Sequence, residues 1–158
     1  MTDASLLLLA NEIRGKTLRV LSGVTEEQAR FTGHPKLNNS ILWHAGHCLW
    51  VVEQLGIVPA TREPVGYTAE WVRLFAAGSA PGNVTEWPTL ASVMEALQAQ
   101  LGRLQDVIRT ASTERMDQVI DAERNRTLRY SILHGLHDEA CHTGEIQLLK
   151  KLWTKQQV

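Results

Sequence analysis

The sequence predicts an all-α protein, a four-helix bundle with a long crossover between its second and third helices. Four long stretches repeat apolar residues at intervals of three and four, the period of an α-helix, and contain no Pro. A connection of roughly thirty residues separates the second stretch from the third, which is too long for a simple hairpin between antiparallel helices. With 158 residues, we expect one domain over residues 1–158, large enough to bury a sizeable core.

The first helix is predicted over residues 3–21. Its leucines and other apolar residues form one stripe, and Gly23 follows as a stop signal. Thr25 then begins a capping-box sequence, Thr-Glu-Glu-Gln, which predicts a short helix that ends before Pro35.

The second long helix is predicted over residues 41–55, with Asn38, Asn39 and Ser40 as good N-cap residues before it and Pro59 shortly beyond its end. Apolar residues surround almost the whole of this helix, so we expect it to be buried on more than one side. His44 and His47 lie within it and should therefore face other parts of the protein.

Residues 56–87 are predicted to form the crossover, with one or two helical turns over residues 67–75. The third long helix follows at residues 90–111, where no Pro interrupts the apolar repeat. Residues 112–126 are charged and break the repeat, which predicts a loop.

The last helix, predicted over residues 127–153, carries a row of ionisable residues. At about 100° per residue, His134, Asp138, His142 and Glu145 fall within a sector of roughly 80°. We predict that this sector faces the core, because Leu149 and Leu152 continue the same line. The opposite side is predicted to be solvated; its residues are Glu139, Thr143, Gln147 and Lys150.

Ionisable side chains that face a core need partners, because a buried charge without one is costly. One interpretation is a hydrogen-bonded core network. The other is a metal site, since Asp138 and His142 are four residues apart on a helix and imidazole with carboxylate suits divalent ions. His137 points about 140° away from His142 and is excluded as its partner. The third ligand must come from another helix, as His44 or His47, and the apolar density of that helix is centred closer to His44.

Charge and composition exclude several functional classes. The 16 Lys and Arg residues balance 17 acidic residues without a basic block, so we expect no nucleic-acid partner. The apolar run near the N-terminus is short and flanked by charges, which argues against a signal peptide or a membrane span. Cys48 and Cys141 form no framework of the secreted type, so we expect a cytoplasmic protein in which both pack as small buried residues, with a redox pair as the lesser alternative.

Two motifs resemble those of the DinB-like superfamily. Residues 43–47, Trp-His-Ala-Gly-His, resemble its first metal motif, Trp-x-x-Gly/Ala-His, in which the final His is a ligand. Residues 134–145 resemble its second motif, in which ligands lie four apart and the later His precedes x-Gly-Gln/Glu. Asp138 departs from the pattern, because His is more usual there. The resemblance therefore implies a metal triad of His47, Asp138 and His142, and a carboxylate in it suits Fe²⁺, Mn²⁺ or Ni²⁺ at least as well as Zn²⁺.

The resemblance also implies a bundle that often forms homodimers and binds a divalent ion with open coordination positions. The superfamily includes thiol-dependent S-transferases and hydrolases. The resemblance therefore implies a small-molecule substrate, such as a low-molecular-weight thiol, as the partner. Glu145 or His134, one turn from a ligand, would then accept a proton or orient a ligand. The alternatives are a stress-associated metal-binding bundle without catalytic turnover and a helical bundle whose polar row is structural.

Overall fold

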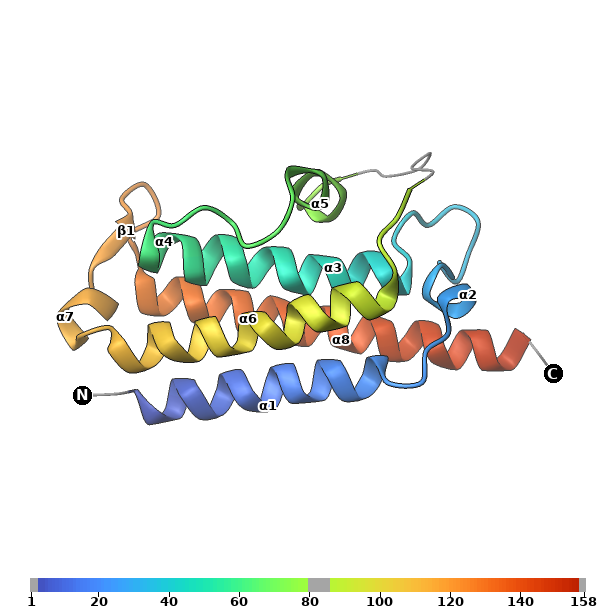
Figure 1. Cartoon of the computed structure of the whole chain (residues 1–158), viewed down its shortest axis with the longest axis horizontal. Coiled ribbons are helices and arrows are strands. Elements are labelled where there is room, and N and C mark those ends of the chain that lie inside the picture. The colour runs from blue at the N-terminus through green and yellow to red at the C-terminus, as the bar shows by residue number, and fades with distance from the viewer. Residues whose placement is uncertain (1–2, 80–85, 157–158) are drawn as a thin grey trace.

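The computed structural model describes residues 3–79 and 86–156. Most of these residues are helical, as predicted. Four helices of ten or more residues run along the long axis of the molecule (Figure 1): α1 (Ala4–Leu21), α3 (Ile41–Val52), α6 (Leu90–Thr110) and α8 (Leu128–Gln156). Helices α1 and α8 run in one direction, and α3 and α6 run in the other.

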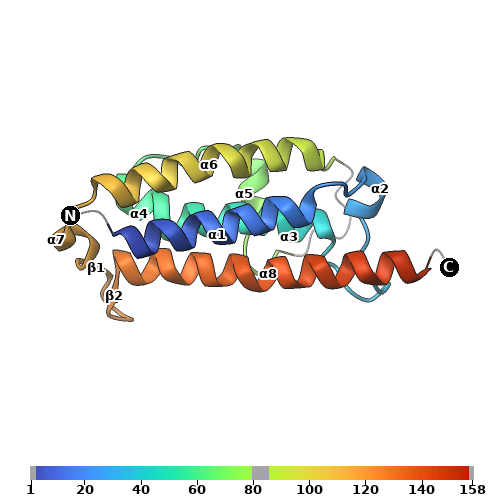
Figure 2. The ribbon, with the colours of Figure 1, turned by 90° about the horizontal axis from the view of Figure 1, so that it is seen from below.

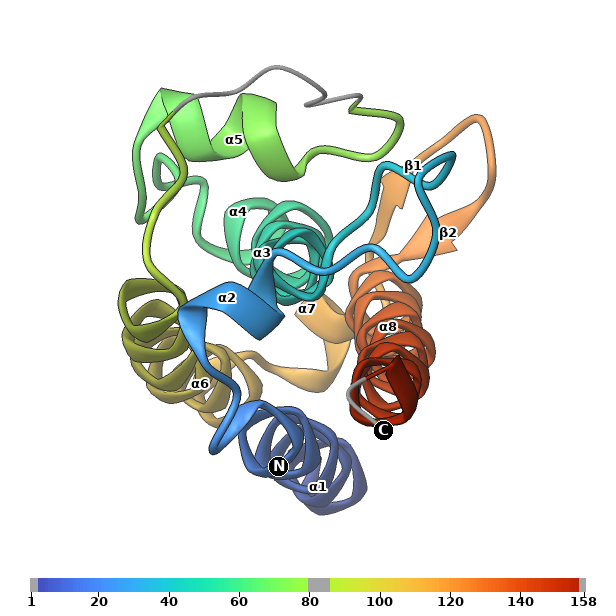
Figure 3. The same cartoon turned by 90° about the vertical axis from the view of Figure 1, so that its right-hand side faces the viewer.

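Each of these helices packs against two of the others. Helix α1 contacts α6 and α8 along its length (Figure 2), and α3 contacts the same two helices. The end view shows α1 diagonally across from α3 (Figure 3). The interior between them is filled by apolar side chains, including Leu21, Leu49, Leu97 and Ile146.

The predicted helix starts agree with the structure because side chains cap them. The carboxylate of Asp3 accepts a hydrogen bond from the backbone N–H of Leu6 at 3.0 Å, and the hydroxyls of Ser40 and Thr89 accept similar bonds at 3.2 and 3.1 Å. Thr25 starts the short helix α2 (Glu26–Ala29) in the same way. These caps satisfy backbone donors that have no partner within the helix.

The second long helix runs further than the sequence predicts. Helix α3 passes directly into a π-helical segment, η1 (Glu53–Ile57), and then into α4 (Val58–Thr61). The wider π turn changes the hydrogen-bonding pattern just before Pro59, so the helical path continues past a residue that would disrupt an ordinary α-helix. Arg62, with a φ of 61° in the left-handed region, ends it.

The crossover carries a helix, α5 (Ala69–Phe75), within the segment predicted to be helical. It lies over the outer side of α3 (Figures 1 and 3). This close approach depends on Gly46, because a Cβ atom there would lie 2.2 Å from the ring of Phe75. The glycine of the first sequence motif thus allows α5 to pack closely against α3.

Residues 112–126, predicted to be a loop, contain a short helix, α7 (Thr113–Met116), and β1 (Val119–Asp121). The strand pairs in antiparallel fashion with β2 (Arg126–Thr127). The turn between them is held by the carboxylate of Asp121, which accepts a hydrogen bond from the backbone N–H of Arg124 at 3.1 Å. Such local contacts leave no hydrophobic repeat, so the periodicity of the sequence did not indicate them.

The buried side of α8 differs from the prediction. Glu139 and Thr143, predicted to be solvated, are 0% and 2% exposed. Arg14 of α1 donates two hydrogen bonds to the Glu139 carboxylate, at 2.8 and 2.9 Å, and Thr17 donates a third at 2.7 Å. The predicted inward row of His134, Asp138 and His142 is only half-buried and lies beside the buried face of α8. The prediction was wrong because the partners that neutralise Glu139 lie on another helix.

The Arg14–Glu139 ion pair belongs to a network that joins α1, α6 and α8 with η1. Arg14 also donates to the side-chain oxygen of Gln100 on α6 at 2.9 Å. Gln100 in turn donates to the Glu53 carboxylate at 2.7 Å, and Arg103 and the backbone N–H of Gly66 donate to the same carboxylate at 2.8 and 3.1 Å. Buried charges that are paired and hydrogen-bonded in this way avoid most of the cost of desolvation.

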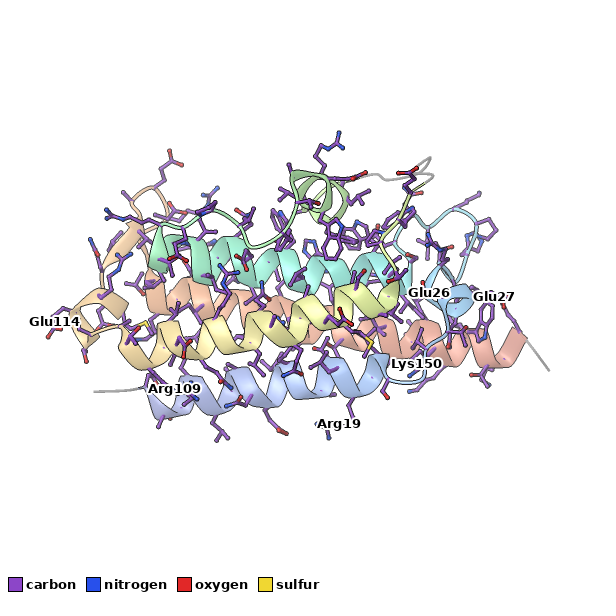
Figure 4. All side chains as sticks on the ribbon, viewed as in Figure 1. Arg19, Glu26, Glu27, Arg109, Glu114 and Lys150 are labelled. Atoms are coloured by element: carbon purple, nitrogen blue, oxygen red, sulfur yellow. The ribbon has the colours of Figure 1, made fainter. Side chains whose placement is uncertain are left out.

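One end of the molecule is held by polar contacts of α2 and α8. Glu26 and Lys150 lie at this end, whereas Glu114 lies at the opposite end (Figure 4). The carboxylate of Glu26 accepts a hydrogen bond from the first backbone N–H of α6, on Leu90, at 2.7 Å. The ammonium of Lys150 donates to the carbonyl of Val20.

Among the described residues, none of the helices combines the length and apolarity needed to cross a lipid bilayer.

Candidate metal centre

Helices α3 and α8 pack closely enough for their polar side chains to meet. Gly135 of α8 lies directly against α3: a Cβ there would be in ordinary van der Waals contact, at 3.5 Å, with the carbonyl oxygen of Val51. Two histidines of α3, His44 and His47, are each 5% exposed and face α8.

His47 meets two residues of α8. Its Nε2 atom lies 3.3 Å from Oδ2 of Asp138, and Nε2 of His142 lies 3.5 Å from the same oxygen. One potential ligand atom from each of these three residues falls within 4.8 Å of the others. The structure therefore brings together the three residues that the sequence motifs imply as ligands.

The orientation of the His47 ring is fixed by residues that are not potential ligands. Its Nδ1 atom lies 2.7 Å from the carbonyl oxygen of Phe75, which can only accept, so Nδ1 carries the proton. The ring is stacked between Trp43 and Trp50, with centroids 4.8 and 5.3 Å away. Burial lowers the pKa of His47, which favours the neutral ring. The Nε2 lone pair consequently points at Asp138.

A lone pair of His47 and a carboxylate oxygen of Asp138 thus face each other without a proton between them. Two acceptors in contact repel, and a cation between them would remove that repulsion. Metal–ligand bonds of about 2.0–2.2 Å place neighbouring ligand atoms about 2.8–3.1 Å apart in octahedral geometry and about 3.3–3.6 Å apart in tetrahedral geometry. The 3.3 and 3.5 Å separations match the tetrahedral range. The residues therefore fit a divalent ion.

A second group lies on the other side of the His142 ring. Nδ1 of His44 is 2.8 Å from Nδ1 of His142 and 2.9 Å from Oε2 of Glu145. Nδ1 of His142 is itself 3.2 Å from that carboxylate oxygen. Burial, followed by the charges of His142 and His47, lowers the pKa of His44 to about 3. His44 is neutral at pH 7, and this group also has the residue types of a metal site.

The two groups compete for His142, because a neutral imidazole offers one lone pair and one N–H. If Nε2 of His142 joins His47 and Asp138, its Nδ1–H can donate to Glu145. That is the usual arrangement of a histidine ligand, which donates its second ring N–H to a carboxylate or a carbonyl. His47 follows the same rule through Phe75, so the first group has both supporting contacts.

Comparison with known proteins places the chain in a family. Residues 10–146 match the sequence profile of the DinB superfamily. The chain belongs to the DinB superfamily. A comparison with curated proteins gave no match. A similar solved structure is the crystal structure of a conserved protein from Enterococcus faecalis, with 15% identity, a TM-score of 0.73, and coverage of 96% of this chain and 97% of that chain. At this identity the likeness shows the fold alone.

The remaining predicted residues of this DinB-superfamily protein belong to neither group of potential ligands among the described residues. The ring of His134 lies against those of Tyr130 and His137. His137 is exposed, which agrees with the prediction that it does not share an ion with His142. Cys48 is buried, whereas Cys141 is exposed, which corrects the expectation that both are buried.

A cavity of about 420 Å³ adjoins the His44 group. His44 and Glu145 form part of its wall, and the loop before α3 and the side of α8 form the rest. Sequence reasoning missed it, because a cavity between a loop and a helix has no periodic signal. Only the cluster of Asn and Ser residues before α3 marked this loop, and those residues were interpreted as helix caps.

Proposed function

We propose that this protein is a divalent-metal-dependent enzyme of the DinB superfamily, with His47, Asp138 and His142 as the ligands. The observation that carries the proposal is the position of His47, whose Nδ1 atom lies 2.7 Å from the carbonyl oxygen of Phe75. Its Nδ1 donates to Phe75, so its Nε2 lone pair faces the Asp138 carboxylate at 3.3 Å. A structural hydrogen-bond network would place a donor at one of these two atoms.

The ligand set narrows the choice of ion and chemistry. Two imidazoles and one carboxylate suit Zn²⁺, Ni²⁺, Fe²⁺ and Mn²⁺. Such an ion supplies Lewis-acid activation of a thiol or a water molecule, which supports an S-transferase or a hydrolase acting on a small-molecule substrate. A low-molecular-weight thiol is the substrate class that we favour.

Glu145 is the protein group best placed to move a proton. Its side chain is 55% exposed, borders the cavity and lies 3.2 Å from Nδ1 of His142. It can hold His142 in the required tautomer and accept a proton from a substrate in the cavity. His134 has no such position, so we leave it out of the mechanism.

We further propose that the four long helices form a single bundle domain, that the protein functions as a homodimer, and that it works in a reducing compartment such as the cytoplasm. Both cysteines are free thiols, which supports the last point.

Metal analysis of the purified protein tests the proposal. We expect close to one divalent ion per chain, and loss of that ion in His142→Ala with the helical circular dichroism unchanged. His137→Ala, an exposed histidine five residues away on the same helix, is the matched control and should keep the ion. Full metal content in His142→Ala would refute the proposed ligand set.

Turnover is tested separately. Metal-loaded protein would be assayed with a panel of low-molecular-weight thiols and electrophiles, and with ester and amide substrates. Activity that is lost on chelation and restored by the ion would support an enzyme. Metal binding without turnover on the panel would favour the stress-associated binding protein.

A further inference from the structure

The cavity beside the His44 group has the size and the lining of a small-molecule site. Its volume of about 420 Å³ lies within the range of such sites in proteins. His44 and Glu145 form one part of its wall, and both contact His142, the proposed ligand nearest to it.

The loop that forms the outer wall is held in place by its own contacts. The carbonyl of His34 accepts hydrogen bonds from the Thr32 hydroxyl at 3.1 Å and from the backbone N–H of Leu37 at 2.9 Å. The backbone N–H of Lys36 donates to the His34 ring at 3.1 Å. Gly33, with a φ of 79°, allows the loop to approach α8, because a Cβ there would lie 2.8 Å from Leu149. The wall is therefore built against α8.

The charges on this wall favour an anion. Lys36 supplies the cationic group of the lining. Within residues 3–79 and 86–156, no carboxylate lies within salt-bridge distance of its ammonium. The acidic member of the lining, Glu145, is held within the His44 group, 2.9 and 3.2 Å from two ring nitrogens. The ammonium of Lys36 is therefore the charged group of this wall that a ligand can pair with, and its partner would be an anion.

The same wall exposes apolar surface. Leu37 and Leu148 are 57% and 56% exposed, and both line the cavity with the buried Leu149. Large apolar side chains grouped beside a pocket mark a surface that an apolar ligand would cover. Asn38 adds an amide that can donate or accept hydrogen bonds.

We propose that this cavity binds a small amphipathic anion, with its acidic group at Lys36 and a short apolar segment against Leu37 and Leu148. The inference rests on the proposed function only in assigning this molecule as the substrate of the adjoining metal centre. Binding itself requires the cavity alone.

Isothermal titration calorimetry on the full chain tests this with octane-1-sulfonate and octan-1-ol, which share an apolar segment and differ in charge. Sulfonate is chosen because it is a weak metal ligand. We expect saturable binding of the sulfonate about fivefold tighter than that of the alcohol, the effect of one largely exposed ion pair. Equal affinities, or the absence of saturable binding, would overturn the proposal.

Variants locate the binding. Lys36→Met should weaken the sulfonate about fivefold and leave the alcohol unchanged, whereas Leu148→Asn should weaken both. Lys151→Met, which removes an exposed lysine of α8 outside the lining, is the matched control and should change neither. If Lys36→Met behaves like Lys151→Met, the anion does not bind at Lys36 and the proposal fails.

The titrations are repeated on chelator-treated and Zn²⁺-reloaded protein, with metal content measured on each sample. Sulfonate binding in both forms supports the cavity assignment. A protein that binds the sulfonate but never a metal would refute the proposed function and leave this inference standing. A protein that binds the metal but not the sulfonate would overturn this inference and leave the proposed metal site standing.

Discussion

At the scale of single residues, the candidate site depends on which ring nitrogen of His47 carries a proton. Phe75 fixes the proton of His47 on Nδ1, so Nε2 meets Asp138 as an acceptor. Asp138 is then the residue whose charge the site depends on, because it touches the Nε2 atoms of both histidines.

Substitution of Asp138 tests this charge. Asp138→Asn keeps the volume and removes the negative charge, so we expect the ion to bind at least about tenfold more weakly. Asp138→His should keep an ion and shift the preference towards Zn²⁺, because imidazole is a softer ligand than carboxylate. Competition titrations with a chelating dye measure both effects. Unchanged affinity in Asp138→Asn would show that Asp138 is not a ligand.

The two cysteines should differ in reactivity. Burial raises the pKa of Cys48 well above its usual range, and the carboxylate of Glu139 raises it further, so the reactive thiolate is scarce at pH 8. Cys141 is exposed. We expect a disulfide reagent to modify one thiol per native chain at pH 8 and two after denaturation, with mass spectrometry locating the first at Cys141. Rapid modification of Cys48 in the native protein would contradict its burial.

At the scale of elements, the site depends on α5 lying tightly against α3. Phe75 of α5 both packs on Gly46 and provides the carbonyl that orients His47. One glycine of the sequence motif therefore supports the ligand beside it by allowing another helix to approach.

Gly46→Ala should displace Phe75, destabilise the fold by about 1–3 kcal/mol through overpacking, and weaken metal binding. Gly144→Ala is the matched control: Gly144 is a helical glycine within the second motif, with nothing within 4 Å of an added Cβ. That change should stabilise the protein by about 0.5–1 kcal/mol. Urea unfolding and metal titration of both variants provide the measurement, and similar results for the two would show that the Phe75 contact is unimportant.

The elements also show what the sequence could and could not predict. The ranges of α1, α6 and α8 follow from their own apolar repeat and caps, so they were predictable. The buried face of α8 was also marked, by Leu128, Ile132, Leu136 and Ile146, but the ionisable row drew the prediction to one edge of that face. The hairpin and the π-helical extension depend on local hydrogen bonds, which a hydrophobic repeat does not report.

At the scale of the whole molecule, the helices are joined through buried charge. The network from Arg14 through Glu139, Gln100 and Glu53 crosses the interior between four helices. Its members lie up to 125 residues apart in the chain, so no local pattern could have paired them. The same holds for the proposed metal triad, whose third member was identified from family resemblance and not from helix geometry.

Breaking this network from one side should be costly. Glu139→Leu leaves the Arg14 guanidinium, 1% exposed, without its carboxylate, and we expect the free energy of unfolding to fall by about 3–5 kcal/mol. The double variant Arg14→Met with Glu139→Leu should recover much of that loss, because it removes both charges. Chemical denaturation of the two proteins measures this. A single variant as stable as the parent would show that the ion pair adds nothing to the fold.

The most direct test of the proposed metal centre compares two variants of α3. His44 and His47 lie one turn apart, are equally buried, and both face His142. His47 alone has its second ring nitrogen held by a backbone carbonyl and its first facing Asp138. We expect His47→Ala to lose the ion and His44→Ala to retain it, with metal content measured per folded chain. Loss of the ion in His44→Ala with retention in His47→Ala would place the centre at His44, His142 and Glu145 and contradict the assignment.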